Sequence, residues 1–89
     1  MQDQEQLEEE FARRKLVEAV ENQIADGHPR EAGLVLMALL SKGLERDDVL
    51  WAMAQVLAEH ISQAMASDQP FDLNGYARDL LALTTEDDD

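Results

Sequence analysis

The sequence predicts an all-α fold, a small four-helix bundle around a central apolar helix at about residues 30–42. Two observations lead to this prediction. No polar side chain occurs from Ala32 to Leu40, and a helix that is apolar all round has to be buried on nearly every side. The remaining apolar residues recur at helical spacing, and the short link before Pro29 makes the first two helices antiparallel neighbours.

The central apolar stretch is predicted to be a helix rather than a buried strand. Pro29 precedes it, and the fixed φ of proline suits the first helical position. Glu31 then places a negative charge in the first turn, where it meets the positive end of the helix dipole. Lys42 and Gly43 follow the stretch as a cation in the last turn and a residue free to adopt the left-handed cap. Val35 is its only β-branched residue, which also favours a helix.

The 89 residues make one domain with charged ends. Of a net charge of −13, residues 1–10 contribute five acids and no base, and residues 86–89 contribute four acids. We therefore predict an acidic N-terminal arm (1–10), ordered or disordered, a helical domain (11–83) and an acidic tail (84–89). The charged ends are interpreted either as a solubility device or as a means of docking a basic partner or mimicking nucleic acid.

Composition argues against several classes of protein. Cysteine is absent, which excludes disulfides and thiolate zinc sites. No run approaches the ~20 apolar residues of a membrane span, and the acidic N-terminus does not resemble a signal peptide, so we expect a cytoplasmic protein without membrane contact. The only basic cluster, residues 13–15, is flanked by glutamates, which argues against direct nucleic-acid binding.

The first helix is predicted at about residues 6–25, ending at Gly27. Four apolar residues between Leu16 and Ile24 share one face, whereas Leu7 and Phe11 lie roughly 140° away from it. One straight helix cannot direct both groups into the same core. Either the N-terminal arm is loose, as chain ends often are, or Leu7 and Phe11 pack on a second surface or a second copy of the chain.

The third helix, predicted from about Arg46 to Ala66, contains a histidine on its apolar stripe. We expect His60 to be a residue at the edge of the core with one hydrogen-bond partner. A small-ligand or metal site, or a buried pH switch, is the alternative. The other histidine, His28, falls in the link before the central helix and is expected to be a turn residue, because a metal needs several converging ligands.

Trp51 lies nearly opposite that stripe, on the polar side of the third helix. A tryptophan there requires a reason, since large aromatic residues are the usual anchors of interfaces. One interpretation is that Leu7 and Phe11, or the last helix, cover Trp51 from within the chain. The other is an exposed anchor for a partner or a second subunit. Trp51, Leu7 and Phe11 are therefore the candidate interaction surface.

The last helix is predicted to begin after Asp72. Asp72 is a favourable N-cap, and Phe71 and Tyr76 have the spacing of a hydrophobic staple. Leu73, Tyr76, Leu80 and Leu83 give this helix one apolar face. Gly75 is expected to weaken the helix by up to ~1 kcal/mol relative to alanine.

From Gly27 onward the chain resembles a group of short, uncharacterised bacterial proteins. The shared pattern is G-x-P-x-E, an apolar helix ending in G-aromatic-S, an acidic pair, V-L-A-x-E-I and P-F-D-x-x-x-Y. The corresponding residues here are Gly27, Pro29, Glu31, Gly43, Leu44, Asp47, Asp48, Val56, Leu57, Ala58, Glu59, Ile61, Pro70, Phe71, Asp72, Tyr76 and Leu80. Of these, Leu44 occupies the aromatic position, and Glu59 lies one residue before the glutamate position. The resemblance implies a shared helical fold and no known activity. Several of these proteins have histidine at the position of Trp51, so no functional residue is carried over.

The sequence contains no recognisable catalytic constellation. Its four glycines form no phosphate loop, its two histidines lie on different elements, and no serine has an evident base. We therefore expect no enzymatic activity, no cofactor and no metal. The favoured hypothesis is a small protein-interaction module, with a homodimer left open. The alternatives are a nucleic-acid-related regulator that acts by acidic mimicry or on a basic partner, and a ligand or metal site at His60.

Overall fold

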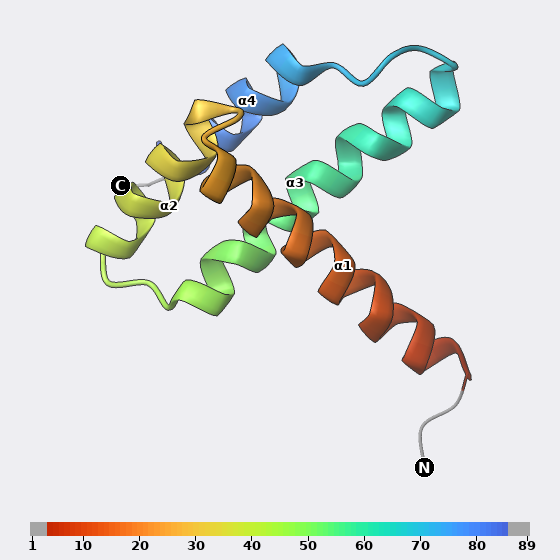
Figure 1. The fold of residues 1–89 in the computed structure, drawn as a ribbon, viewed down its shortest axis with the longest axis horizontal. Coiled ribbons are helices and arrows are strands. Elements are labelled where there is room, and N and C mark those ends of the chain that lie inside the picture. The colour runs from red at the N-terminus through yellow and green to blue at the C-terminus, as the bar shows by residue number, and fades with distance from the viewer. Residues whose placement is uncertain (1–3, 86–89) are drawn as a thin grey trace.

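The computed structural model describes residues 4–85, which form four α-helices and no strand. They are α1 (Gln4–Asp26), α2 (Arg30–Ser41), α3 (Arg46–Ser67) and α4 (Leu73–Ala82) (Figure 1). This confirms the predicted all-α four-helix bundle. Residues 1–3 of the predicted N-terminal arm and residues 86–89 of the predicted tail lie outside the described residues. No helix in the described part of the chain is long and apolar enough to span a bilayer.

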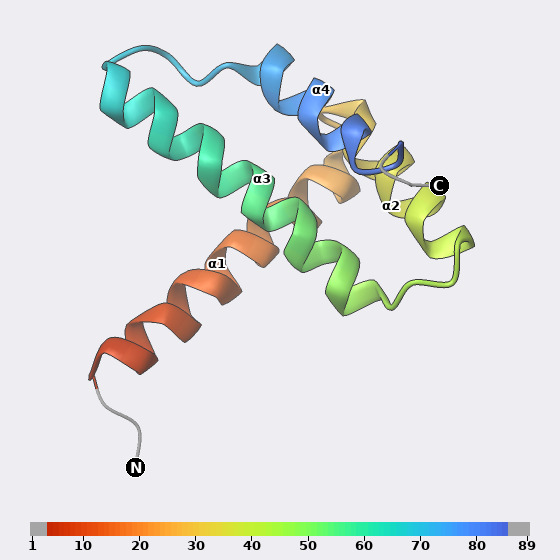
Figure 2. The same ribbon diagram turned by 180° about the vertical axis from the view of Figure 1, so that it is seen from behind.

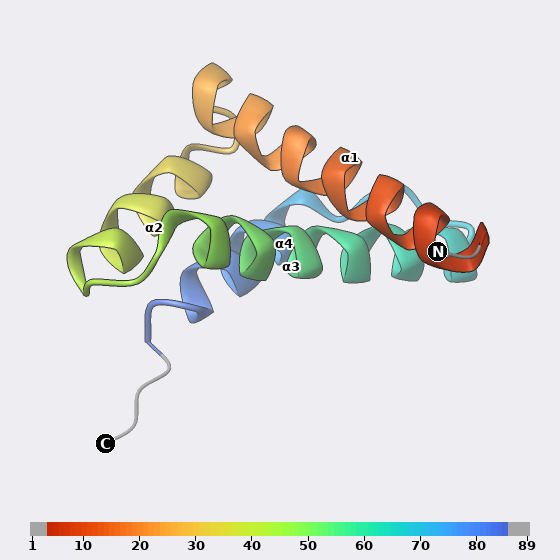
Figure 3. The same cartoon turned by 90° about the horizontal axis from the view of Figure 1, so that it is seen from below.

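The helices form a crossed arrangement rather than four parallel rods. α2 and α3 each pack against all three other helices. Within the described residues, α1 and α4 do not pack against each other. Seen from behind, α3 and α1 cross each other near the middle of α3 (Figure 2). Seen from below, α1 forms its own layer over α3 (Figure 3). The first half of α1 therefore extends beyond the body of the bundle.

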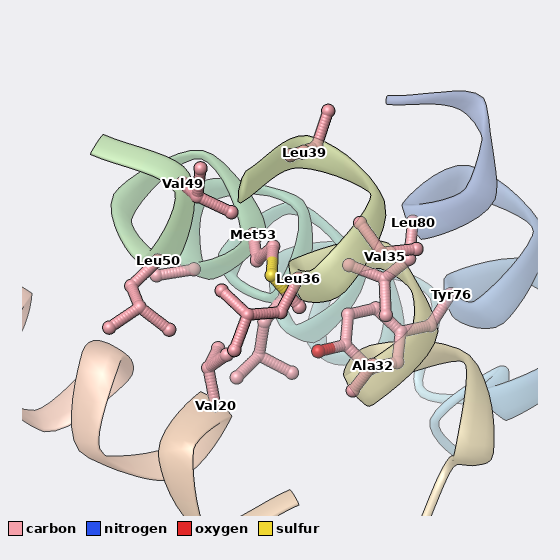
Figure 4. Close-up of a cluster of buried hydrophobic side chains, with 12 residues drawn as sticks. Val20, Ala32, Val35, Leu36, Leu39, Val49, Leu50, Met53, Tyr76 and Leu80 are labelled. Atoms are coloured by element: carbon pink, nitrogen blue, oxygen red, sulfur yellow. The ribbon is translucent and has the colours of Figure 1, made fainter. Parts of the chain in front are cut away.

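The core lies where α2 and α3 face the second half of α1 and the inner side of α4 (Figure 4). All four helices contribute to it, α1 through a single fully buried residue. Its members are Val20, Ala32, Val35, Leu36, Leu39, Val49, Leu50, Met53, Ala54, Leu57, Tyr76 and Leu80.

The helix ends follow local sequence signals. Gly43 has φ +92°, the left-handed conformation expected after α2. At the start of α4, Oδ1 of Asp72 accepts a hydrogen bond of 3.0 Å from the Gly75 N–H, which confirms the predicted N-cap. The rings of Phe71 and Tyr76 pack edge to face at 5.6 Å, which confirms the predicted staple. Glu45, a weak cap by sequence, makes no side-chain capping bond.

The prediction that α2 is buried on nearly every side is wrong on one face. Leu34 and Met37 are 54% and 70% exposed. The reason is geometric: three neighbouring helices in so small a domain cover only part of the circumference of α2. An all-apolar helical stretch therefore leaves an apolar strip on the surface here.

The apolar face predicted for α4 is only partly buried. Tyr76 and Leu80 are completely buried, but Leu73 is 38% exposed because it begins the helix at the rim of the bundle. Gly75 has a packing role that the sequence did not reveal. A Cβ at this position would collide with the Asp72 carboxylate and would stand 3.3 Å from Cε1 of His60.

Candidate functional site

The first half of α1 is exposed along most of its surface. Every residue from Gln4 to Lys15 is exposed, and Leu16 is the first that is partly buried. A free helix of this length is marginally stable in water. It is maintained here as the continuation of the packed second half, so its surface is available for contacts outside the bundle.

Leu7 and Phe11 form an apolar pair on this exposed segment. They are 48% and 54% exposed and stand four residues apart, which places them next to each other on one side of the helix. The charged ends of Arg14 and Lys15 lie 5.7 and 5.6 Å from the centre of the Phe11 ring. The pair is thus a small apolar ridge with cations at one end.

Trp51 lies at the crossing of α1 and α3. It is half-buried and packs against the edge of the core. The guanidinium carbon of Arg13 stands 4.4 Å from the centre of its ring. A cation in that position is attracted to the face of an indole by about 0.5–2 kcal/mol, depending on desolvation. The Arg13 side chain therefore covers one face of the Trp51 ring.

An open groove of about 480 Å³ runs from Trp51 along the underside of the first half of α1. Its α1 wall includes Gln6, Glu9, Ala12, Arg13 and Leu16. A second groove of about 310 Å³, on the other side of Arg13, is lined by Val17 and Leu50 among others. Both grooves are open rather than enclosed, which suits contact with a protein surface better than enclosure of a small molecule.

The structure does not bring the three predicted interaction residues together. Trp51 is covered by α1, as one interpretation expected, but by Arg13 rather than by Leu7 and Phe11. Neither Leu7 nor Phe11 lines the groove at Trp51, because the two residues lie on another side of α1. α1 is helical from Gln4 onward, so its first turn is not loose. Its two apolar faces point in different directions, and the one formed by Leu7 and Phe11 is exposed instead of packed in the core.

His60 is buried at the other end of α3. Its side chain is 5% exposed, and Nε2 lies 2.7 Å from Oδ2 of Asp79 on α4. The rings of Phe71 and Tyr76 contact it edge to face, with centres 6.2 and 6.0 Å away. This confirms the predicted histidine at the core edge with one hydrogen-bond partner.

The bond to Asp79 assigns the protons of the His60 ring. A carboxylate only accepts hydrogen bonds, so Nε2 carries the hydrogen and donates it, and Nδ1 of the neutral ring is an acceptor. Nδ1 is buried without a partner among the described residues. An unsatisfied buried acceptor costs about 1–3 kcal/mol. Among the buried side-chain nitrogen and oxygen atoms of the described residues, Nδ1 of His60 is the one without a hydrogen-bond partner.

Tyr76 links α4 to α1 although the two helices do not pack together. Its hydroxyl donates a hydrogen bond of 2.6 Å to Oε1 of Gln23. Burial raises the pKa of Tyr76 to about 12. The phenol is therefore neutral and acts as a structural tie.

Sequence reasoning missed two residues of these sites. Arg13 was assigned to a surface basic cluster, and Asp79 had no assigned role. Only the one-turn spacing of Tyr76 and Asp79 on α4 could have suggested that both face the same neighbour. His28 is exposed in the link, as expected for a turn residue. Residues 4–85 contain no group of three histidine or acidic side chains that could hold a metal ion.

Comparison of the chain with protein-family models, with curated proteins and with solved structures gives no match.

Proposed function

We propose that this protein is a small non-catalytic interaction module that binds a partner protein through the exposed first half of α1. One observation carries the proposal: about three turns of helix extend beyond the bundle with Leu7 and Phe11 uncovered. An apolar pair spaced four residues apart is how an amphipathic helix enters the groove of another protein. Aromatic residues are frequent anchors of such contacts.

The charges of this segment favour a basic partner. Glu5, Glu8, Glu9 and Glu10 are all exposed within two turns of Leu7. Their combined negative field would accelerate the encounter with a positively charged surface and would repel acidic proteins. Added salt screens such an attraction, so binding should weaken as ionic strength rises.

The test is an affinity capture from bacterial lysate at low and high salt. The baits are the wild type, the double variant Leu7→Ser/Phe11→Ser and the matched control Met65→Ser. Met65 is 77% exposed and lies on α3, away from the first half of α1. We expect the wild type and the control to retain the same basic protein, the double variant to lose it, and high salt to release it.

Circular dichroism must first show that all three baits are equally helical. Equal retention by the double variant and the wild type would refute the proposed role of Leu7 and Phe11. Loss from an Arg13→Ala bait alone would move the contact to the groove beside Trp51. Sedimentation of the wild type, in turn, determines whether a second copy of the chain is the partner.

A further inference from the structure

The outer side of α2 carries a line of four exposed residues, which we call the α2 strip. They are spaced four, three and four apart, which places them along one side of a helix, opposite the side that faces the core: Arg30, Leu34, Met37 and Ser41. α2 lies at the edge of the bundle, away from the first half of α1 (Figure 1). The α2 strip is therefore a surface separate from Leu7 and Phe11.

The charge of the α2 strip differs from that of the chain as a whole. The chain has a net charge of −13, yet the strip includes one base and no acid. Two copies of this acidic chain thus bring no carboxylates together when they meet across it. Gly33 and Ala38 border the strip on its two sides, and such small residues let two helices approach closely.

The α2 strip is complementary to itself when two copies lie antiparallel. With a two-fold axis midway between Leu34 and Met37, Leu34 of one copy lies opposite Met37 of the other, and the contact occurs twice. The same axis sets Arg30 opposite Ser41, at the C-terminal end of the other α2, where the helix dipole is negative. Each apolar side chain then meets an apolar one, and each base meets a negative helix end.

A second pair of charges fits the same arrangement. Glu31 and Lys42 lie near opposite ends of α2, on the same flank of the strip. The two-fold axis keeps that flank on its own side and reverses the chain direction, so it brings Glu31 of one copy toward Lys42 of the other. Glu31 forms no ion pair within residues 4–85. Lys42 donates a hydrogen bond of 2.9 Å from Nζ to the Thr84 carbonyl, which holds it beside the end of α2.

We propose that the α2 strip binds the α2 strip of a second copy of the chain, with the two helices antiparallel. One pair of 12-residue helices is a small contact, so the dimer is weak and forms reversibly at high concentration. The dimer leaves Leu7 and Phe11 uncovered on both copies. It therefore carries two α1 interaction surfaces, and a partner with two matching sites would bind it more tightly than the monomer.

The experiment is sedimentation equilibrium of the full chain from about 10 µM to about 1 mM, in about 0.15 M salt to screen the net charge. We expect monomer at the low end and dimer at the high end. Met37→Glu should weaken association by a factor of about ten or more, because the two-fold axis buries the new charge twice. The matched control is Met65→Glu on α3, which changes an equally exposed methionine by the same charge and should leave association unaltered.

A mixture of two variants tests the antiparallel facing. Leu34→Lys and Met37→Glu should each associate weakly with themselves, whereas an equimolar mixture should associate about tenfold more tightly than either alone. In the mixed dimer the new lysine faces the new glutamate, and the other Leu34–Met37 contact is native. Circular dichroism first establishes that every variant is folded.

Four results would each overturn the proposal: a wild type that is monomeric throughout, equal weakening by Met65→Glu, no gain in the mixture, or loss of the dimer from Leu7→Ser/Phe11→Ser. The last would assign the contact to α1. A monomeric wild type that still retains a basic protein would refute this inference alone and would leave the proposed function standing.

Discussion

The two halves of α3 meet their neighbours in contrasting ways. The N-terminal half crosses α1, where Trp51 is half-buried beneath one arginine and shallow grooves open on either side. In the C-terminal half, Nε2 of His60 binds Asp79 on α4. Tyr76, also on α4, binds Gln23 on α1 through its hydroxyl. The comparison indicates that the α4 end is tied by hydrogen bonds between side chains, whereas the outer part of α1 is left exposed.

The largest difference between the two regions should come from truncating one aromatic residue in each. Tyr76→Ala removes a completely buried ring and should reduce the free energy of unfolding by about 3–5 kcal/mol. Phe11→Ala removes a ring that is 54% exposed and should change it by less than about 0.5 kcal/mol. Urea denaturation followed by circular dichroism measures both. Similar losses would mean that the exposed segment is part of the folding unit.

A smaller difference is expected between two glycine replacements in helices. Gly33→Ala places a methyl group where no heavy atom lies within 4 Å, so better helix propensity should stabilise the protein by about 0.5–1 kcal/mol. Gly75→Ala displaces the capping carboxylate of Asp72 and should destabilise it by about 0.5–1 kcal/mol despite the same gain in propensity. Thermal melts of the pair compare them directly. Stabilisation by both would show that the α4 end is loosely packed.

Removing only the hydroxyl of Tyr76 should have a moderate effect with a distinctive pH dependence. Tyr76→Phe leaves Gln23 without its partner, which should cost about 1 kcal/mol at neutral pH. The pKa of Tyr76 rises from 10.0 to about 12 on folding, so the folded state favours the protonated phenol. The resulting stability is complete below pH 10 and is lost as the pH rises from 10 to about 12.

Denaturation curves of the wild type and Tyr76→Phe between pH 8 and 12 test this dependence. The wild type should lose stability in the alkaline range, and the phenylalanine variant should lose less of it. Parallel decline of the two proteins would mean that another group governs the alkaline transition.

The smallest effect should come from the ion pair across the α1–α3 crossing. Arg46 and Glu21 lie 3.2 Å apart, and both side chains are about half exposed at 53% and 46%. Exposed pairs contribute roughly 0.2–1 kcal/mol at most. A double-mutant cycle with Arg46→Ala and Glu21→Ala should therefore give a coupling below about 0.5 kcal/mol. A coupling of several times that value would show that the crossing is held electrostatically.

The features predictable from sequence are those that depend on neighbours along the chain. Asp72 as a cap, Gly43 as a helix end and the pairing of Phe71 with Tyr76 each require only residues within one or two turns. Helical spacing likewise placed His60 on the buried side of its helix. These local signals were sufficient for the fold class and for most helix boundaries.

What could not be predicted depends on the distance between elements. The stacking of Arg13 on Trp51 requires the angle at which α1 crosses α3, and the bond from His60 to Asp79 requires the position of α4. The exposure of Leu34 and Met37 has a similar origin. An apolar sequence shows that a helix can be buried, but the number of neighbouring helices decides how much of its surface is covered.

Trp51 and Tyr76 are the only tryptophan and the only tyrosine in the chain, and they stand at the two contrasting regions of α3. Each region thus has its own intrinsic chromophore. Indole emission should respond when α1 moves and the Arg13 guanidinium leaves the ring. Between pH 10 and about 12, phenolate absorbance should appear only when Tyr76 is released from its buried site. The unlabelled protein can therefore report optically which region opens first during unfolding or on binding a partner.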